Sequence, residues 1–207
     1  LLFLLFAVPV ASLYAATETE QIEFADGLFA RGMNEMAVAE YKRFLKDFPK
    51  SELVPKALFY LGHALCKIGE NKEAETVFRD LFAKYPTSEY RFRAALARAQ
   101  IFSDLKQYSS AVYVLKNMFK EDVPADITPS AMYLLGDSLL RDGKTAEAAE
   151  TLENLRKRYP SAPQSIYATL DLGKIYSGLD KTVSDEVKPD YEKAVALYKE
   201  ITAKPPN

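Results

Sequence analysis

The chain has few of the residues on which catalysis and metal binding usually depend. Its 207 residues include one cysteine, Cys66, and one histidine, His63, so it can form no internal disulfide. The two fall on one face if this segment is helical, but two ligands cannot complete a zinc site, and we read them as a half-buried structural pair. Glycine-rich phosphate loops, HExxH and GxSxG are also absent from the sequence. We therefore predict a non-enzymatic protein with no cofactor, no metal and no small-molecule substrate.

The charge balance argues against a nucleic-acid partner. Lys and Arg together number 27 and Asp and Glu 29, for a net charge of -2, and no basic run stands out. Tryptophan is absent, whereas 13 Tyr and 12 Phe are present. These rings could stack on bases, but most fall on core positions of the repeat described next, and nothing basic accompanies them to hold phosphates.

A 37-residue period runs through the chain. Counted from residue 18, small residues recur at the eighth place of each unit and alanine at the twentieth. A bulky residue follows at the twenty-fourth place, and then a proline. The eighth-place residues are Ala25, Gly62, Ala99, Gly136 and Gly173; the alanines are Ala37, Ala74, Ala111, Ala148 and Ala194; the bulky residues are Tyr41, Phe78, Leu115, Leu152 and Tyr198; the prolines are Pro49, Pro86, Pro124, Pro160 and Pro206.

Each recurring place has a physical reason in a pair of antiparallel helices. We expect the eighth-place residue and the twentieth-place alanine to lie opposite each other, because small residues let two helices approach closely. The bulky residue then fills the core one turn later. Proline ends the second helix, and Gly32, Gly69 and Gly143 stand at the turn between helices, where a positive φ is needed.

This pattern resembles the tetratricopeptide repeat family over residues 18–207. The resemblance implies an all-α, right-handed superhelical solenoid of five helix-turn-helix units, about 18–54, 55–91, 92–128, 129–165 and 166–207, within a repeat domain 17–207. The fifth unit carries a nine-residue insertion within 177–189. Junctions of the form aromatic-Pro-x-Ser, at Phe48–Ser51 and Tyr85–Ser88 and in altered form at Tyr159–Ser161, are similar to a bacterial envelope subclass. That subclass includes Tol–Pal-associated and outer-membrane β-barrel assembly repeat proteins.

The first sixteen residues have the composition of a secretory signal peptide. An apolar run, LLFLLFAVPV, is followed by small residues up to Ala16 and then by polar ones. No Met or basic stretch precedes the run, so we expect the start of the gene product to be missing. The prediction is export to the periplasm with cleavage near Ala16, and the alternative is an uncleaved inner-membrane anchor.

The resemblance also implies where a partner would bind. In tetratricopeptide proteins the concave surface comes from the second, fifth, ninth and twelfth places of each first helix. The fifth place is apolar throughout (Ile22, Phe59, Leu96, Tyr133, Leu170), the ninth is polar (Asp26, His63, Gln100, Asp137, Lys174), and the twelfth holds Phe29, Cys66, Ser103, Leu140 and Ser177. An apolar row beside a polar row suits an extended peptide or an amphipathic helix. The alternative is that the fifth-place residues are core.

The proposed binding residues are therefore Phe59, His63, Leu96, Gln100, Tyr133, Asp137, Leu170 and Lys174. The family's clamp for a terminal carboxylate needs Lys and Asn at places that hold Ile22, Asp26 and Phe59 here, so that specificity is not expected. We predict a protein-binding scaffold or adaptor of the cell envelope, with peripheral association to membrane-bound envelope proteins. The alternative is the repeat accessory domain of a larger protein, such as an enzyme, whose remainder lies beyond residue 207.

Overall fold

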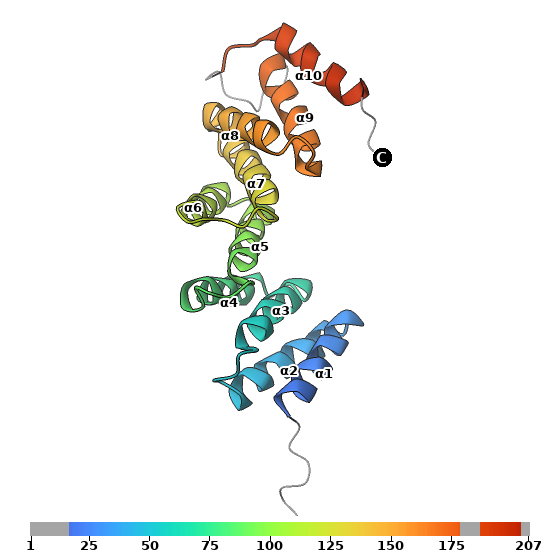
Figure 1. The fold of residues 1–207 in the computed structure, drawn as a ribbon, viewed down its shortest axis with the longest axis vertical. Helices are drawn as coiled ribbons and strands as arrows, with labels where there is room; N and C mark the ends of the chain where they lie inside the picture. The colour runs from blue at the N-terminus through green and yellow to red at the C-terminus, as the bar shows by residue number, and fades with distance from the viewer. Residues whose placement is uncertain (1–16, 179–186, 204–207) are drawn as a thin grey trace, which may run out of the picture. The chain divides into compact units, whose positions relative to one another are not determined.

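The described residues, 17–178 and 187–203 of the computed structural model, form α-helices and no strand (Figure 1). In chain order these are α1 (Glu18–Ala30), α2 (Asn34–Asp47), α3 (Val54–Lys67), α4 (Asn71–Lys84), α5 (Arg91–Asp104), α6 (Tyr108–Met118), α7 (Thr128–Arg141), α8 (Thr145–Arg158), α9 (Pro163–Ser177) and α10 (Tyr191–Ala203). The all-α helical repeat fold predicted from the sequence is confirmed. The predicted signal peptide, most of the predicted insertion and Pro206 lie outside the described residues.

The chain divides into two compact units, Leu1–Glu73 and Ala74–Asn207, with the division in the first turn of α4. In the first unit, α2 packs between α1 and α3. In the second, α5 packs with α6, α7 with α8 and α9 with α10, and each pair packs on the next. The first helices α5, α7 and α9 also contact one another in sequence, which brings their side chains to a shared surface.

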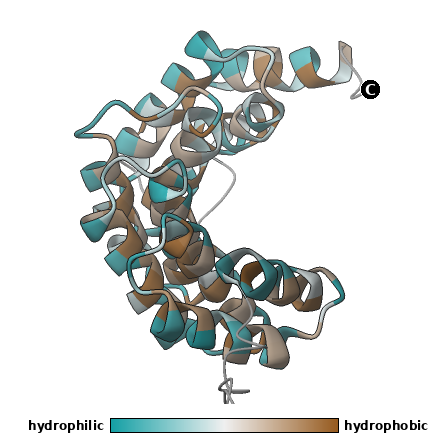
Figure 2. Cartoon of the chain, turned by 60° about the horizontal axis from the view of Figure 1, so that its bottom comes forward, coloured by the Kyte–Doolittle hydropathy of each residue, from teal (hydrophilic) through white to brown (hydrophobic). Residues whose placement is uncertain are grey.

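Each second helix presents one apolar stripe to this core. In α8 the buried residues include Ala148, Ala149, Leu152 and Leu155, which fall on one face at helical spacing. Figure 2 shows the result along the helices, where hydrophobic and hydrophilic segments alternate within single turns. None of the described helices combines the length and apolar character that a membrane span requires.

The glycines at the eighth place make room for a large side chain. A Cβ added at Gly136 would lie 2.5 Å from Cδ2 of Leu152, and one added at Gly173 would lie 2.6 Å from Cε1 of Tyr198. The side chain nearest to a Cβ added at Gly136 is thus that of Leu152, at the twenty-fourth place, rather than that of the twentieth-place Ala148. The bulky twenty-fourth-place residue takes that position, because it fills the space that a missing side chain leaves over the helix backbone.

The turns between paired helices share one geometry. Gly32, Gly69 and Gly143 have φ of +75°, +84° and +80°, as the sequence predicts. After Gly143 the amide of Lys144 donates back to the carbonyl of Leu139 at 2.9 Å, and the same bond closes the other two turns. In the third pair Lys106 occupies this place with φ +59°, and the Gln107 amide donates to Phe102 at 2.8 Å. The turn therefore forms there without glycine.

The aromatic-Pro-x-Ser junctions connect one unit to the next. Helices α2, α4 and α8 end just before the aromatic residue, as expected from the following proline. The Ser51 hydroxyl accepts from the amide of Leu53 at 3.0 Å, and Ser88 does the same for Tyr90 at 3.1 Å. At the altered junction Ala162 keeps only the backbone bond, from its amide to the Tyr159 carbonyl at 3.0 Å.

Ion pairs link the second helices of neighbouring repeats. Lys42 pairs with Glu73 at 2.8 Å, and Lys116 pairs with Glu147 at 2.5 Å. The equivalent pair between α8 and α10 has the opposite polarity, because Glu153 contacts Lys193 at 2.5 Å. These side chains are roughly half exposed, so each pair contributes about 0–1 kcal/mol.

Candidate binding site

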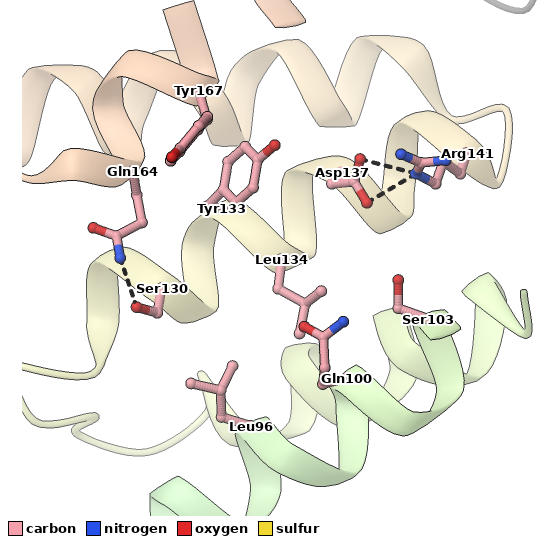
Figure 3. A pocket seen from close by; sticks show the side chains of 10 residues that line it. All are labelled: Leu96, Gln100, Ser103, Ser130, Tyr133, Leu134, Asp137, Arg141, Gln164 and Tyr167. Carbon is pink, nitrogen blue, oxygen red and sulfur yellow. Dashed lines mark hydrogen bonds and ion pairs between the residues drawn. The ribbon is translucent and has the colours of Figure 1, made fainter. Parts of the chain in front are cut away.

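A hollow of about 380 Å³ lies across the first helices α5, α7 and α9 of the second unit. Figure 3 shows side chains from all three helices converging on it. Its lining residues are Leu96, Gln100 and Ser103 from α5, Ser130, Tyr133, Leu134, Asp137 and Arg141 from α7, and Gln164 and Tyr167 from α9. The volume suits a few side chains of a bound segment rather than a whole domain.

Apolar groups and two aromatic rings form one part of the hollow. Leu134 is buried and Leu96 is half-buried, so both contribute apolar surface that is held in place by the core beneath. The rings of Tyr133 and Tyr167 have centroids 5.7 Å apart with an interplanar angle of 43°. Tyr167 is 55% exposed, and a bound segment could therefore cover a large part of its ring.

Neutral amide and hydroxyl groups supply most of the polar lining. Gln164 donates to the Ser130 hydroxyl at 2.9 Å, and Gln100 donates to Asp104 at 2.7 Å. Asp137 accepts two hydrogen bonds from Nε of Arg141, both at 2.9 Å, which raises the pKa of Arg141. The two charged residues of the lining therefore neutralise each other, and the hollow has no net charge.

Tyr133 is fixed from behind by a buried carboxylate. Its hydroxyl donates to Oδ2 of Asp171 at 3.2 Å, and Asp171 is only 6% exposed. Lys174 completes the arrangement by donating to Oδ1 of Asp171 at 2.7 Å. Burial and the charges of Asp171 and Asp137 raise the pKa of Tyr133 above its ordinary value, so the phenol remains a neutral donor.

The structure brings together half of the residues that the sequence proposed for binding. Leu96, Gln100, Tyr133 and Asp137 line one hollow. Lys174 is not part of the lining but contacts Asp171, which accepts from Tyr133, and Leu170 is half-buried and is not part of the lining either. A binding role for these residues stays a prediction.

Phe59 and His63 lie in the first unit and pack on each other. Their ring centroids are 4.5 Å apart in an edge-on arrangement, and both residues are half-buried. Burial, together with the charge of Lys67, lowers the pKa of His63, so the ring favours its neutral form. Of the fifth-place row, Ile22 is core, with 2% exposure, and Phe59, Leu96, Tyr133 and Leu170 each keep some exposed surface.

Sequence reasoning missed half of the lining. Ser130 and Tyr167 stand at the second place of their units, a place that the family pattern includes and that could have been carried over to residues. Leu134, Arg141 and Gln164 fall outside the family's four places. Only the packing of α5, α7 and α9 brings them in, and no spacing rule in the sequence would have found them.

Among the described residues, no three His, Cys, Asp or Glu side chains lie close enough together to hold a metal ion. Cys66 is half-buried on α3, on the same helix as His63. The hollow offers hydrogen-bond donors, acceptors and apolar surface, which are the means of binding a polypeptide segment.

Comparisons with known proteins agree with this class of fold. Residues 56–88 and 130–162 match the tetratricopeptide repeat model, which supports that assignment for the second and fourth units. No curated protein matches the chain in sequence. MamA (residues 41 to the end) from Desulfovibrio magneticus RS-1 has a similar structure, with 21% identity, a TM-score of 0.70 and coverage of 90% of this chain and 93% of that chain.

Two further solved structures have the same fold. A tetratricopeptide repeat protein from Parabacteroides merdae ATCC 43184 is 15% identical, with a TM-score of 0.71 and coverage of 92% of this chain and 68% of that one. YrrB, described as a tetratricopeptide repeat protein with an unusual peptide-binding site, is 17% identical, with a TM-score of 0.60 and coverage of 90% and 89%. At these identities the likeness concerns the fold alone.

Proposed function

We propose that this protein binds a segment of a partner protein in the hollow across α5, α7 and α9. The observation that carries the proposal is the convergence of ten side chains from three consecutive first helices on one hollow of about 380 Å³. Repeat proteins of this class typically act through such surfaces, and they are typically non-catalytic scaffolds. YrrB, which shares the fold, has a peptide-binding site according to its description.

The chemistry of the lining specifies the kind of segment. Leu96 and Leu134 would receive an apolar side chain, and the ring of Tyr167 would cover it. Gln100, Ser103 and Gln164 offer groups that can hydrogen-bond to a peptide backbone. Since Asp137 and Arg141 neutralise each other, the favoured segment is uncharged where it meets the hollow.

We further propose that the protein works in the bacterial cell envelope as a non-catalytic scaffold or adaptor. The support is the apolar leader at residues 1–16 and the aromatic-Pro-x-Ser junctions at Phe48 and Tyr85. Mass spectrometry of the N-terminus from a fractionated native host would test export. A mature protein that starts near Thr17 in the periplasmic fraction is expected, and an intact leader in the cytosol would refute export.

A photo-crosslinking amino acid in place of Tyr167 tests the binding site. In native envelopes it should capture one defined protein, because Tyr167 lines the hollow and is 55% exposed. The matched control is the same substitution at Tyr113, which is 66% exposed on α6 and outside this hollow.

A second change, Ser130→Arg, places a long cationic side chain in the hollow. It should weaken capture from position 167 about tenfold, equivalent to about 1.4 kcal/mol of binding free energy, without lowering the unfolding temperature. Equal capture from positions 167 and 113, or capture that survives Ser130→Arg, would mean that the hollow is not the binding site.

A further inference from the structure

Neighbouring repeats meet through one recurring pair of positions. The twenty-first place of a unit, on its second helix, meets the seventh place of the next unit, on its first helix. One such pair is seen directly, because Glu75 on α4 accepts from Arg98 on α5 at 2.6 Å, and both side chains are largely buried. Val112 with Leu135, and Ala149 with Leu172, occupy the same two places within shared core clusters. Val38 and Leu61 do so in the first unit, and both are buried.

The same places are exposed at the two ends of the array. Phe24, at the seventh place of α1, is 55% exposed, although its equivalents Leu61, Leu135 and Leu172 are at most 8% exposed. Val195, at the twenty-first place of the fifth unit on α10, is 50% exposed, although Val38, Val112 and Ala149 are at most 8% exposed. Within the described part of the chain, each end therefore presents half of a repeat junction.

The residues around these two positions follow the same rule. Tyr198 is 38% exposed, whereas its equivalents Tyr41, Leu115 and Leu152 are fully buried. Gly27 on α1 has open space where a Cβ would point, whereas Ala64, Ile101 and Ile175 at its place are buried. The exposed face of α10 thus corresponds to the face on which the first helix of a following repeat packs. The exposed face of α1 corresponds to the face that packs on the second helix of a preceding repeat.

The charges at the two ends are compatible. Lys56, at the second place of the second repeat on α3, pairs at 2.6 Å with Asp26, at the ninth place of the first repeat on α1. At the chain ends, the ninth place of the fifth unit, on α9, is Lys174, and the second place of the first unit, on α1, is Thr19, between the exposed Glu18 and Glu20. A first helix docked on the last repeat would therefore bring acidic residues toward Lys174, whose side chain is half exposed although it also pairs with Asp171 at 2.7 Å.

We propose that two copies of this chain associate head to tail, with α1 of one copy docked on α10 of the other through Phe24 and Val195. Such an interface is heterologous, so it can add copies in a row rather than stop at a symmetric dimer. Phe24 and Val195 are not among the residues that line the hollow across α5, α7 and α9, and the proposal does not depend on the function proposed for that hollow.

Complementary blocking variants test this arrangement. In sedimentation velocity on the full chain, the average mass of the wild type should rise with concentration. Phe24→Glu and Val195→Glu should each stay monomeric, because each variant places a charge on one half of the junction. A 1:1 mixture should give about twice the monomer mass, because one variant keeps its α10 face and the other keeps its α1 face.

The double variant Phe24→Arg/Val195→Glu supplies a rescue. It recreates between copies the Arg98–Glu75 pair seen inside the chain, so association should return and weaken as salt is raised. Tyr113→Glu, at an exposed residue of α6, is the control and should associate like the wild type. Circular dichroism of each variant checks that it is folded.

Three outcomes would overturn the proposal. The first is a wild type that stays monomeric at every concentration, and the second is a mixture of the two variants that stays monomeric. The third is association that is lost in Phe24→Glu and unchanged in Val195→Glu. That result would mean that α1 docks on a surface of the second copy other than α10.

Discussion

The glycines of this protein occupy two kinds of place, and the two kinds are needed for unrelated reasons. Gly136 and Gly173 lie inside helices, where Leu152 and Tyr198 take the space of a side chain. Gly69 and Gly143 lie in turns with φ above +75°, and a Cβ added at either would have no atom within 4 Å. A substitution at the first kind is opposed by packing, whereas one at the second kind is opposed by backbone conformation.

The largest effect is expected for Gly136→Val. Its side chain would overlap Leu152, which is fully buried and has little freedom to move. We expect a loss of about 3 kcal/mol in the free energy of unfolding, measured by urea denaturation. Gly27→Ala is the control, because a Cβ there meets open space on a helix. It should gain about 0.5–1 kcal/mol, and a similar loss in both variants would contradict the packing explanation.

An intermediate effect is expected for Gly143→Ala. The site has ample room, but φ of +80° is costly for any residue with a Cβ. The loss should be about 1 kcal/mol in the same urea measurement, and the crosslinking from Tyr167 should not change. A neutral result would mean that the turn can relax to a different backbone conformation.

The smallest effect, with the opposite sign, is expected for Lys106→Gly. Lys106 holds the same left-handed turn at φ +59°, so glycine should relieve strain and stabilise the chain by about 0.5–1 kcal/mol. Thermal unfolding followed by circular dichroism would measure the gain as a higher midpoint. A lower midpoint would show that the lysine side chain contributes more than the strain costs.

The periodicity in the sequence was sufficient to predict the helical repeat, because small, bulky and proline residues recur in register. It was not sufficient to predict which residues touch. Ala148 was expected opposite Gly136, whereas the atoms nearest to a Cβ added there belong to Leu152, since the offset between two antiparallel helices depends on their crossing and not on spacing alone.

The candidate site was likewise predictable only in part: the sequence indicated which helix face carries it but not all of the residues that line it. Residues at the family's places, such as Leu96 and Tyr133, reach the hollow because each first helix presents the same face. Arg141 and Gln164 enter it only through the relative rotation of α7 and α9. A single sequence carries no direct record of that rotation.

The reversed ion pair between α8 and α10 makes the order of the repeats matter. If repeats were exchanged by recombination so that the fifth followed the third, Lys116 would meet Lys193, and like charges would replace attraction. If the fourth repeat were duplicated in tandem, Glu153 of one copy would meet Glu147 of the next. Each mismatch is weak, yet both lower the stability of the folded chain. Duplicating or reordering the repeats would therefore give less stable proteins in some orders than in others. The polarity of these ion pairs therefore favours the present order of the repeats over other orders.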